Sequence, residues 1–435
     1  MPLLIVVLGL ILLFLLIAKF KLNAFIAFII VSLAVGMAEG MDLDQVVKSI
    51  EHGIGNTLGF LVMILGLGAM LGKLVADSGA AQQITTKLVA KFGIKNIQWA
   101  LVLTGFIVGI PLFYEVGFVI LIPLIFTITA STGLPLLYVG LPMIASLSVT
   151  HGYLPPHPAP TAITAMFNAD LGKTLLYGII IAIPAITVAG PWFSRTIKNV
   201  KATPLKDFVN PTVLTEEEMP GINTSIFTAL LPIILIMFST IADLLFPKDY
   251  GFMPFVNFLG NPVIAMLISV LVAIYTLGLA RGKRMADIMG SMSSSISGIT
   301  MVLLIIAGAG ALKEVLIDSG VSLYIAESLK DSSVSPLLLA WFVARVCVGS
   351  ATVAGLTTAG IVMPLISTTG VSPELMVLAI GSGSLMLSHV NDGGFWLFKE
   401  YFNLSIKDTL KTWTVMETTV GVMGLIGVMI LSLFV

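Results

Sequence analysis

Apolar residues in this chain gather in long blocks that are separated by short polar stretches. A helix needs about 20 mostly apolar residues to cross a lipid bilayer. Blocks of that length, or close to it, cover residues 2–18, 23–38, 54–76, 174–193, 225–246, 258–280, 294–317 and 413–434. The pattern therefore predicts an all-α, polytopic membrane protein.

Two stretches between these blocks, 97–170 and 335–402, do not divide into clean helices. Each contains two apolar arms separated by a turn, followed by an apolar run that is interrupted. The turns fall at 113–117 and 349–355, and the interruptions at 150–158 and 389–394. Irregular backbone at membrane depth is tolerated only where it is buried in protein or lines a cavity. We therefore interpret each stretch as a re-entrant hairpin followed by a discontinuous helix; the alternative is fully spanning helices with proline and glycine kinks.

The chain also repeats itself at an interval of roughly 240 residues. The matching segments are Gly66–Ala69 with Gly308–Ala311, Asp77–Gly79 with Asp318–Gly320, Trp99 with Trp341, and His151 with His389. Paired halves are typical of secondary transporters, whose substrate site lies between the repeats near the bilayer midplane. We expect a first repeat at 1–194, a linker at 195–224 and a second repeat at 225–435.

Charged residues between the blocks predict how the repeats are oriented. Each repeat is expected to hold about five spanning helices and one hairpin, so it crosses the membrane an odd number of times and the two repeats have inverted topology. Lys and Arg accumulate in cytoplasmic loops. The residues placed there are Lys19, Lys21, Lys87, Lys91, Lys95, Arg195, Lys198, Lys201, Lys206, Arg281, Lys283 and Arg284. The acidic residues Glu39, Asp42, Asp44, Asp318, Glu327 and Asp331 fall outside, as do both termini.

Composition supports the membrane assignment independently. Hydrophobic residues make up 57% of the chain and charged residues only 10%, and the mean hydropathy is +1.07. Soluble domains carry about 25% charged residues, so this chain could not cover a water-facing surface, and no basic patch suggests nucleic acid. The first apolar run has no basic residues before it, so we interpret it as an anchor rather than a cleaved signal peptide.

Ionisable and polar groups that interrupt apolar segments are the candidate site, because such groups are expensive in a membrane and face the protein interior or an aqueous cavity. The first hairpin tip supplies Tyr114 and Glu115; the second supplies Ser350 and Thr352, with Arg345 about one turn earlier. The first helix break supplies Thr150, His151, His157 and Thr161, and the second His389, Asn391 and Asp392. Helix ends at such breaks present unpaired backbone groups that can hold ions.

Several of these residues have structural alternatives. Arg345 can pair with a carboxylate to hold the fold, and Glu115 is either that partner or a proton carrier. His151 and His157 are six residues apart among prolines, so we expect no zinc site and no other metal site. Lys73 and Lys313 lie near helix ends and are expected to extend to the membrane interface. Glycines at 66, 68, 308 and 310 are expected to allow close helix packing.

Motifs along the whole chain carry a family resemblance. They are Tyr114–Phe118, Ser148–Gly152, Pro155–Pro158, Gly349–Ala354, Ser388–Asp392, Gly394–Lys399, Glu216–Pro220 and Thr412–Thr418. In these segments the chain resembles the gluconate permease family of proton symporters, within the ion-transporter superfamily. One departure is Gly393, at the second break, where relatives carry Pro or Ala.

The resemblance implies a bacterial inner-membrane importer of gluconate or a related sugar acid such as idonate. It implies protons as the coupling ion, the lipid bilayer as surroundings and no further cofactor, and it leaves a homo-oligomer open. We expect Ser350, Thr352 and Arg345 to meet the substrate carboxylate and Asn391, His389, His151 and Thr150 its hydroxyls, with Tyr114, His157 and Thr161 in the same site. Glu115 or Asp392 would carry the proton.

Three alternative functions stay open at this point. Within the family, the alternative is an amino-acid symporter of the D-serine type. From another class, a membrane-embedded hydrolase could use His and Glu side chains. A hydrolase needs no inverted repeat, so the doubled sequence argues against an enzyme and for a secondary transporter. A passive channel is the third alternative. A proton gradient drives uptake above equilibrium through a symporter but not through a channel.

Overall fold

The computed structural model describes residues 2–203, 214–247, 249–321, 334–346, 351–389 and 392–435. These residues form helices and connecting loops, with no strand among them. The first part contains α1 (Pro2–Phe14), α2 (Ala24–Ala38), α3 (Leu43–Asp77), α4 (Ala80–Phe92), α5 (Ile97–Gly109), α6 (Tyr114–Thr132), α7 (Leu136–Tyr153), α8 (Pro158–Met166), α9 (Leu171–Thr187) and α10 (Phe193–Thr196). The second contains α11 (Ile222–Leu245), α12 (Met253–Gly260), α13 (Pro262–Ala273), α14 (Met285–Asp318), α16 (Pro336–Val346), α17 (Ala351–Thr369), α18 (Pro373–Leu385), α19 (Gly393–Tyr401), α20 (Ile406–Thr409) and α21 (Val415–Leu431).

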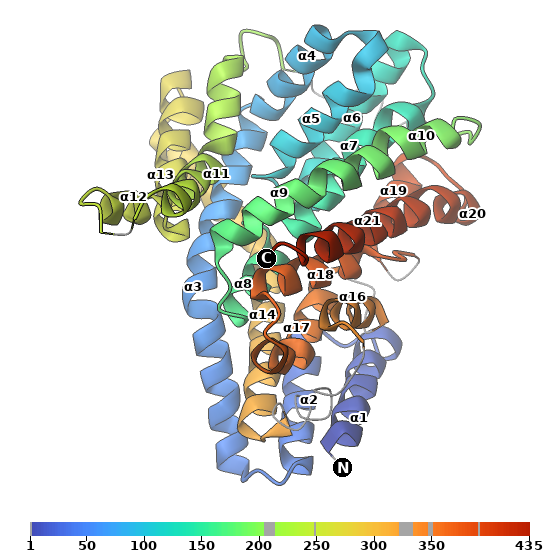
Figure 1. Ribbon diagram of the computed structural model, residues 1–435. Coiled ribbons are helices and arrows are strands. Elements are labelled where there is room, and N and C mark those ends of the chain that lie inside the picture. Colours follow the sequence, from blue (N-terminus) through green and yellow to red (C-terminus); the bar gives the residue numbers. More distant parts are fainter. Residues whose placement is uncertain (1, 204–213, 248, 322–333, 347–350, 390–391) are drawn as a thin grey trace.

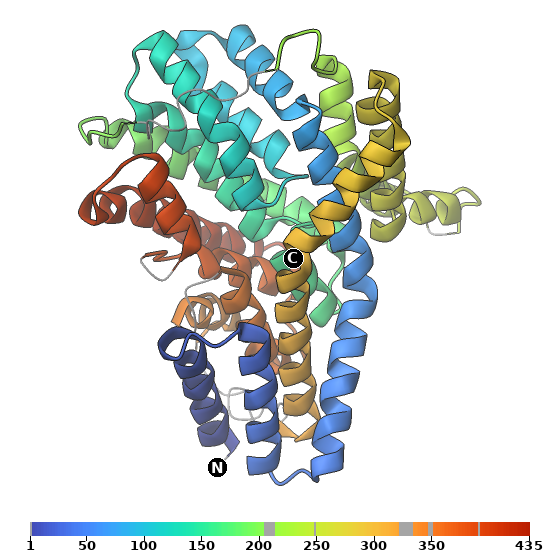
Figure 2. The same ribbon diagram turned by 180° about the vertical axis from the view of Figure 1, so that it is seen from behind.

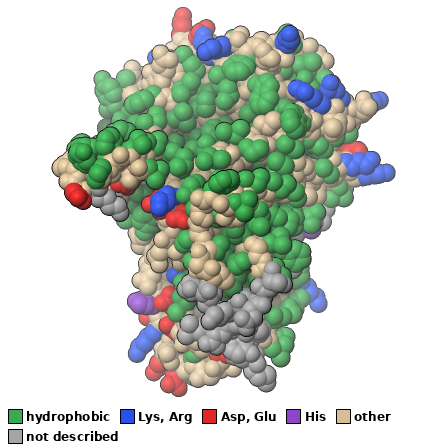
Figure 3. Space-filling view, in the orientation of Figure 1, with side chains coloured by type: hydrophobic (Ala, Val, Ile, Leu, Met, Phe, Trp, Pro, Cys, Tyr) green, Lys and Arg blue, Asp and Glu red, His purple; other side chains and the backbone are tan. Residues whose placement is uncertain are grey.

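The described helices fit a membrane. Seven are long and apolar enough to cross a bilayer, and an eighth crossing results if α4 and α5, which bend by 110° at a short break, count as one. Large apolar side chains such as Leu245 and Tyr275 are more than half exposed, and hydrophobic atoms cover most of the face shown in Figure 3. The predicted all-α polytopic class is confirmed, whereas the count of ten spans and two hairpins stays a prediction.

Two long helices, α3 and α14, pack against each other and extend along most of the height of the molecule (Figures 1 and 2). They contain 35 and 34 residues, or about 50 Å each. They pack antiparallel, because Gly53 lies against Gly310 while Gly66 lies near Ile296. A β-carbon on Gly53 would collide with the Gly310 carbonyl group, so this close approach requires glycine, as expected for tightly packed membrane helices.

Both helices begin earlier than the predicted spans at 54–76 and 294–317. Polar residues fill the first turns of α3, which has Asp42 at its N-cap. Apolar content marks only the portion of a helix that lipid surrounds, whereas α3 and α14 also support each other beyond that portion. A 35-residue helix is longer than the roughly 30 Å hydrocarbon layer, so its polar end extends past it.

The order of elements after α3 recurs after α14. In both halves a short helix, α5 or α16, precedes a 19-residue helix, α6 or α17, and then an interrupted pair. The short helices have 13 and 11 residues, too few to cross a bilayer. In both views, α5 and α6 lie in the upper half of the molecule and α16 and α17 in the lower half (Figures 1 and 2). This recurrence fits two hairpins, while the inverted orientation of the repeats stays a prediction.

Each interrupted pair contains the break that the sequence predicts. In the first, α7 ends at Tyr153 and α8 begins at Pro158, because prolines at 155 and 156 cannot donate to a helix. In the second, α18 ends at Leu385 and α19 begins at Gly393. Leu387 there has a left-handed φ of 53°, so the second break starts before the predicted residue 389.

Other boundaries differ from the sequence pattern. The predicted span 258–280 contains the end of α12 and the start of α13, because the Asn261 side chain caps α13 by accepting from the Val263 N–H at 3.0 Å. Pro262 occupies the first position of α13, where a proline needs no partner for its nitrogen. The last predicted span, 413–434, is part of a helical segment from 406 to 431. The division at 195–224 into two repeats and a linker stays a prediction, and residues 204–213 of that linker lie outside the described residues.

Candidate functional site

Two adjoining cavities lie where the helix breaks and the two long helices meet. The larger has a volume of about 480 Å³; its polar and charged lining residues are Lys73, Glu115, His151, Ser294, Ser295 and Thr352. The smaller has a volume of about 70 Å³. It shares Glu115, His151 and Thr352 with the larger cavity and adds Tyr114, Ser148, Asp392, Trp413 and Glu417. The three shared residues make the two cavities neighbouring parts of one site.

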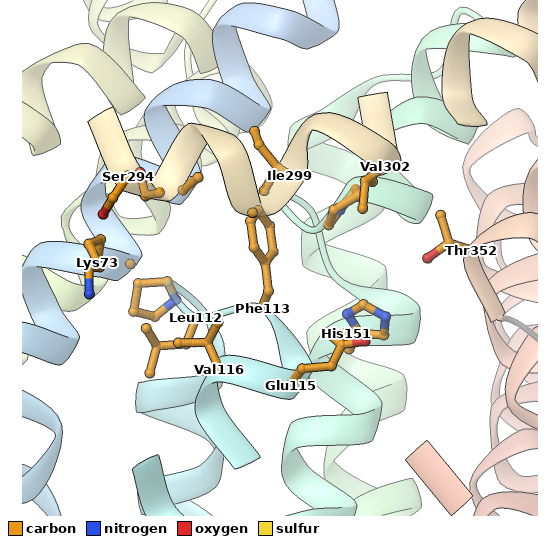
Figure 4. Close-up of a pocket in the computed structure, with 16 residues that line it drawn as sticks. Lys73, Leu112, Phe113, Glu115, Val116, His151, Ser294, Ile299, Val302 and Thr352 are labelled. Carbon is orange, nitrogen blue, oxygen red and sulfur yellow. The ribbon is translucent and has the colours of Figure 1, made fainter. Parts of the chain in front are cut away.

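The larger cavity is elongated (Figure 4). Lys73 and Ser294 lie at one end, while His151 and Thr352 lie toward the other, and Phe113 stands between them. Lys73 comes from α3 and Ser294 from α14, whereas His151 lies in the last turn of α7, just before the first break. A polar chain lying along this cavity could contact a cation at one end and hydroxyl and imidazole groups at the other.

Helix starts face both cavities. Glu115 lies in the first turn of α6 and Thr352 in the first turn of α17. The first backbone N–H groups of a helix have no partner within it and favour negative charge. No side chain caps the start of α6, so these N–H groups can serve an anionic group in the cavity.

His151 and His157 lie together at the first break, with ring centroids 5.3 Å apart. His157 is buried, and its Nε2 lies 2.7 Å from the Gly109 carbonyl oxygen, to which it donates. It therefore ties the break to the end of α5. His151 lines both cavities, and its buried Nδ1 has no hydrogen-bond partner among the described residues. His151 is the imidazole that a substrate could reach.

Asp392 holds the second break in place. It is the N-cap of α19, and its carboxylate accepts from the Gly394 N–H at 3.0 Å and from the Ser388 hydroxyl at 2.6 Å. The Ser388 oxygen in turn accepts from the Trp413 ring N–H at 2.8 Å. Two oxygens of Asp392 thus serve as acceptors for fixed donors, as a helix cap requires.

The structure brings five of the predicted site residues to the cavities: Tyr114, Glu115, His151, Thr352 and Asp392. Thr150 donates to the Leu147 carbonyl of its own helix at 2.9 Å, and Thr161 is fully buried on α8. Neither of them, nor His157, nor the exposed His389, is among the described residues that line the two cavities. Ser350, Asn391 and the Arg345 side chain lie outside the described residues.

Sequence reasoning missed two charged residues of this site. Glu417 on α21 is 2% exposed and accepts a hydrogen bond from the Ser148 hydroxyl. The available signal was an acidic residue inside the apolar block 413–434. Lys73, expected at the membrane interface, lines the larger cavity and donates to Asp77 at 2.9 Å. The sequence pattern placed Lys73 near a helix end, whereas α3 continues to Asp77 and packs against α14, so the Lys73 side chain faces the cavity.

A helical membrane fold whose helix breaks meet at a polar cavity is that of a secondary transporter. The family model for GntP family permeases matches residues 1–434. The chain belongs to that family, and it is a permease rather than an enzyme.

Named relatives agree with this assignment over their whole length. The chain is 56% identical to the high-affinity gluconate transporter of Escherichia coli K12, across 100% of both chains. It is 54% identical to the Gnt-II system L-idonate transporter of the same organism, across 99% of each. Among solved structures, the Alcanivorax borkumensis YdaH transporter matches with a TM-score of 0.64 at 17% identity, covering 94% of this chain and 96% of that one. That last similarity supports the fold alone. The resemblance drawn from the motifs is confirmed.

Proposed function

We propose that this permease imports gluconate or a closely related aldonate, such as idonate, across the bacterial inner membrane together with protons. The observation that carries the proposal is identity of 56% and 54%, across 100% and 99% of each chain, to transporters named for gluconate and L-idonate. The cavities supply the chemistry that such a substrate needs: one lysine, several hydroxyl groups, the imidazole of His151, and carboxylates.

The larger cavity is the proposed binding site. Its volume of about 480 Å³ lies in the range of small-molecule sites, about 300–1,000 Å³. An aldonate has a carboxylate at one end and a row of hydroxyls. Lys73 can meet the carboxylate at one end of the cavity, and His151 and Thr352 can bond hydroxyls at the other (Figure 4).

The second hairpin and the second break complete the proposed site. Arg345, Ser350 and Asn391 belong to segments adjoining Thr352 and Asp392 in the sequence, and both of these line the smaller cavity. We propose that they add contacts to the substrate carboxylate and hydroxyls. Apolar residues such as Val116 and Ile299 line the larger cavity and limit the water that can accompany the substrate.

Proton coupling requires a carboxyl group that changes its protonation during the transport cycle. Glu115 lines both cavities, and Asp392 and Glu417 line the smaller one. A substrate anion in the larger cavity therefore lies beside carboxylates whose charge it opposes. Like charges disfavour one another's ionised form, so protonation of one carboxyl group and binding of the anion favour each other.

Uptake of labelled gluconate into proteoliposomes tests the proposal. We expect an inward proton gradient to drive accumulation, an uncoupler to abolish it, and idonate to compete. D-serine and dicarboxylates serve as further competitors. Competition by D-serine or dicarboxylates without competition by aldonates would overturn the substrate assignment. Accumulation that continues in the presence of the uncoupler would overturn proton symport.

A further inference from the structure

A buried carboxyl group, Glu417, lines the smaller cavity. It is 2% exposed, on the apolar helix α21, and it accepts a hydrogen bond from the Ser148 hydroxyl of α7. Given the proton symport proposed above, on which this inference rests, we infer that Glu417 is the group that takes up and releases the coupling proton.

The crowding of carboxylates is the first reason. Glu115, Asp392 and Glu417 all line one cavity of about 70 Å³, and Tyr114 lies within electrostatic reach of all three. Neighbouring carboxylates disfavour one another's ionised form, most strongly for a carboxylate that is shielded from water. An ionisable group inside a membrane protein is costly and usually serves a function, and Glu417 is the most buried of the three.

The hydrogen-bond partners distinguish Glu417 from Asp392. Asp392 accepts from the Gly394 N–H with one oxygen and from the Ser388 hydroxyl with the other. Ser388 already accepts from the Trp413 ring N–H, so a proton on either oxygen of Asp392 would disrupt the network that caps α19. The Ser148 hydroxyl can donate to a carboxylate and can also accept from a carboxylic acid. The Ser148 contact therefore suits both protonation states of Glu417, which a proton carrier needs.

Exposure distinguishes Glu417 from Glu115. Glu115 is exposed to the larger cavity, where water can solvate its charge in either state. The side chain of Glu417 is shielded from that cavity and shares the smaller one with His151. A carrier that holds its proton during a conformational change must be shielded from water, and Glu115 is then placed to pass protons between the larger cavity and Glu417.

Other groups face Glu417 from the elements that pack around it. Tyr153 on α7 lies within electrostatic reach of Glu417 and donates to the Val420 carbonyl of α21, which fixes the helix. Tyr114 and Glu115 face it from α6, His151 from α7, and Asp392 from the start of α19. The proton that reaches Glu417 comes from water on the outer side, converts its carboxylate to a carboxylic acid, and leaves to water on the inner side.

Substrate binding and protonation of Glu417 are then linked. The protonated side chain places one negative charge fewer beside the anionic substrate, so gluconate binds more tightly to the protonated protein. Linkage requires the reciprocal effect, in which gluconate favours protonation. The affinity for gluconate should fall with rising pH, by up to about tenfold per pH unit, which is the limit for one linked proton.

The experiment compares Glu417→Gln, Glu115→Gln and Asp392→Asn in proteoliposomes, with Glu400→Gln as the matched control because Glu400 is exposed beside Lys399. Three quantities are measured: exchange of external for internal gluconate, accumulation driven by a proton gradient, and gluconate affinity between about pH 5 and pH 8. We expect Glu417→Gln to keep exchange within about threefold, to lose accumulation, and to bind gluconate with an affinity independent of pH. The amide mimics the protonated carboxyl group and still accepts from Ser148.

A second variant, Ser148→Ala, keeps the inference testable if the first folds poorly. In Ser148→Ala the Glu417 carboxylate loses the hydroxyl that donates to it, so the carboxyl group keeps its proton up to a higher pH. The fall in gluconate affinity with rising pH should therefore occur at a higher pH than in the wild type, while gluconate exchange continues. A purely structural role of Ser148 would leave the pH profile in place.

Three results would overturn the assignment. They are accumulation by Glu417→Gln at the wild-type level, loss of exchange together with accumulation in that variant, and a pH-independent affinity in Glu115→Gln alone. Failure of the wild-type protein to accumulate gluconate, or to respond to the proton gradient, is a different outcome and would count against the proposed function itself.

Discussion

The two cavities of this site differ in charge, and the difference assigns them different tasks. The larger one has a lysine, Lys73, at one end and hydroxyl groups on α14 and α17. The smaller one collects three carboxylates, of which Glu417 is buried. Cations and hydroxyls suit an anionic, hydroxylated substrate, whereas clustered carboxylates suit a proton. The shared residues, Glu115, His151 and Thr352, are the places where binding and coupling can communicate.

The largest expected effect concerns Lys73. Lys73→Met should weaken gluconate binding by about 10- to 100-fold, since a hydrogen bond to a charged group contributes about 1.5–3 kcal/mol. Because Lys73 lies outside the smaller cavity, proton-driven accumulation at saturating gluconate should persist. Binding and uptake kinetics measure both.

Lys313→Met is the matched control for that variant. Lys313 was expected at the membrane interface for the same reason as Lys73, and it lies on α14 outside the residues that line the two cavities. Equal weakening of binding in the two variants would contradict the division of tasks between the cavities.

How much of this comparison the sequence could predict depends on the residue. The first break follows from Pro155 and Pro156, because the missing N–H groups act locally, and Glu115 and His151 stand out as ionisable residues in apolar segments. The sequence pattern did not identify Glu417 and Lys73 as site residues, because their role depends on which face of α21 and α3 turns toward the cavities. That orientation results from packing against α7 and α14, which no local pattern encodes.

The fold shows the same limit. Apolar blocks predicted most helices because lipid imposes a minimum apolar length. The polar first turns of α3 gave no such signal, and the split between α12 and α13 depends on a single cap at Asn261. Local chemistry thus predicts where helices break, and tertiary packing decides which charges meet.

The next prediction concerns the side of the membrane on which the larger cavity lies. Lys283 donates to the Asp77 carbonyl at 3.2 Å, so the loop at Arg284 marks the Lys73 end of the cavity. Cys347 is the single cysteine of the chain, so Cys347→Ala gives a background without thiols. In intact cells, cysteines introduced one at a time in place of Lys91 and Arg284 should not react with a thiol reagent that cannot cross the membrane, whereas a cysteine in place of Asp42 should react. A cysteine at Asp331, which lies outside the described residues, should also react. Labelling at Arg284 from outside would contradict the inverted repeats and would place the Lys73 end outside.

A smaller effect is expected at Thr352, which lines both cavities. Thr352→Ala should weaken gluconate binding by about 3- to 10-fold, the equivalent of one neutral hydrogen bond. Thr352→Ser restores the hydroxyl and should restore the affinity. If Thr352→Ser does not restore the gluconate affinity, the methyl group of Thr352 rather than its hydroxyl contacts the substrate, and Thr352 does not provide a hydrogen bond to it.

The smallest expected effect lies outside both cavities and separates global pH effects from those of Glu417. Glu218 precedes α11, and its carboxylate accepts from the Thr215 N–H at 2.7 Å and from the Thr215 hydroxyl at 2.9 Å. These bonds lower the pKa of Glu218 from its ordinary value of 4.5.

A carboxyl group with a lowered pKa in the folded state stabilises the protein at pH values above its ordinary pKa. This stabilisation is lost as the pH falls through the lowered pKa of the folded state. Glu218→Ala should therefore melt slightly below the wild type at pH 7, and the two melting temperatures should converge once the pH falls below the lowered pKa of Glu218. Its gluconate affinity should follow the wild-type pH profile throughout, because Glu218 is exposed and lines neither cavity. A flattened profile in Glu218→Ala would mean that the pH dependence of binding reflects the stability of the whole protein rather than a proton held in the smaller cavity.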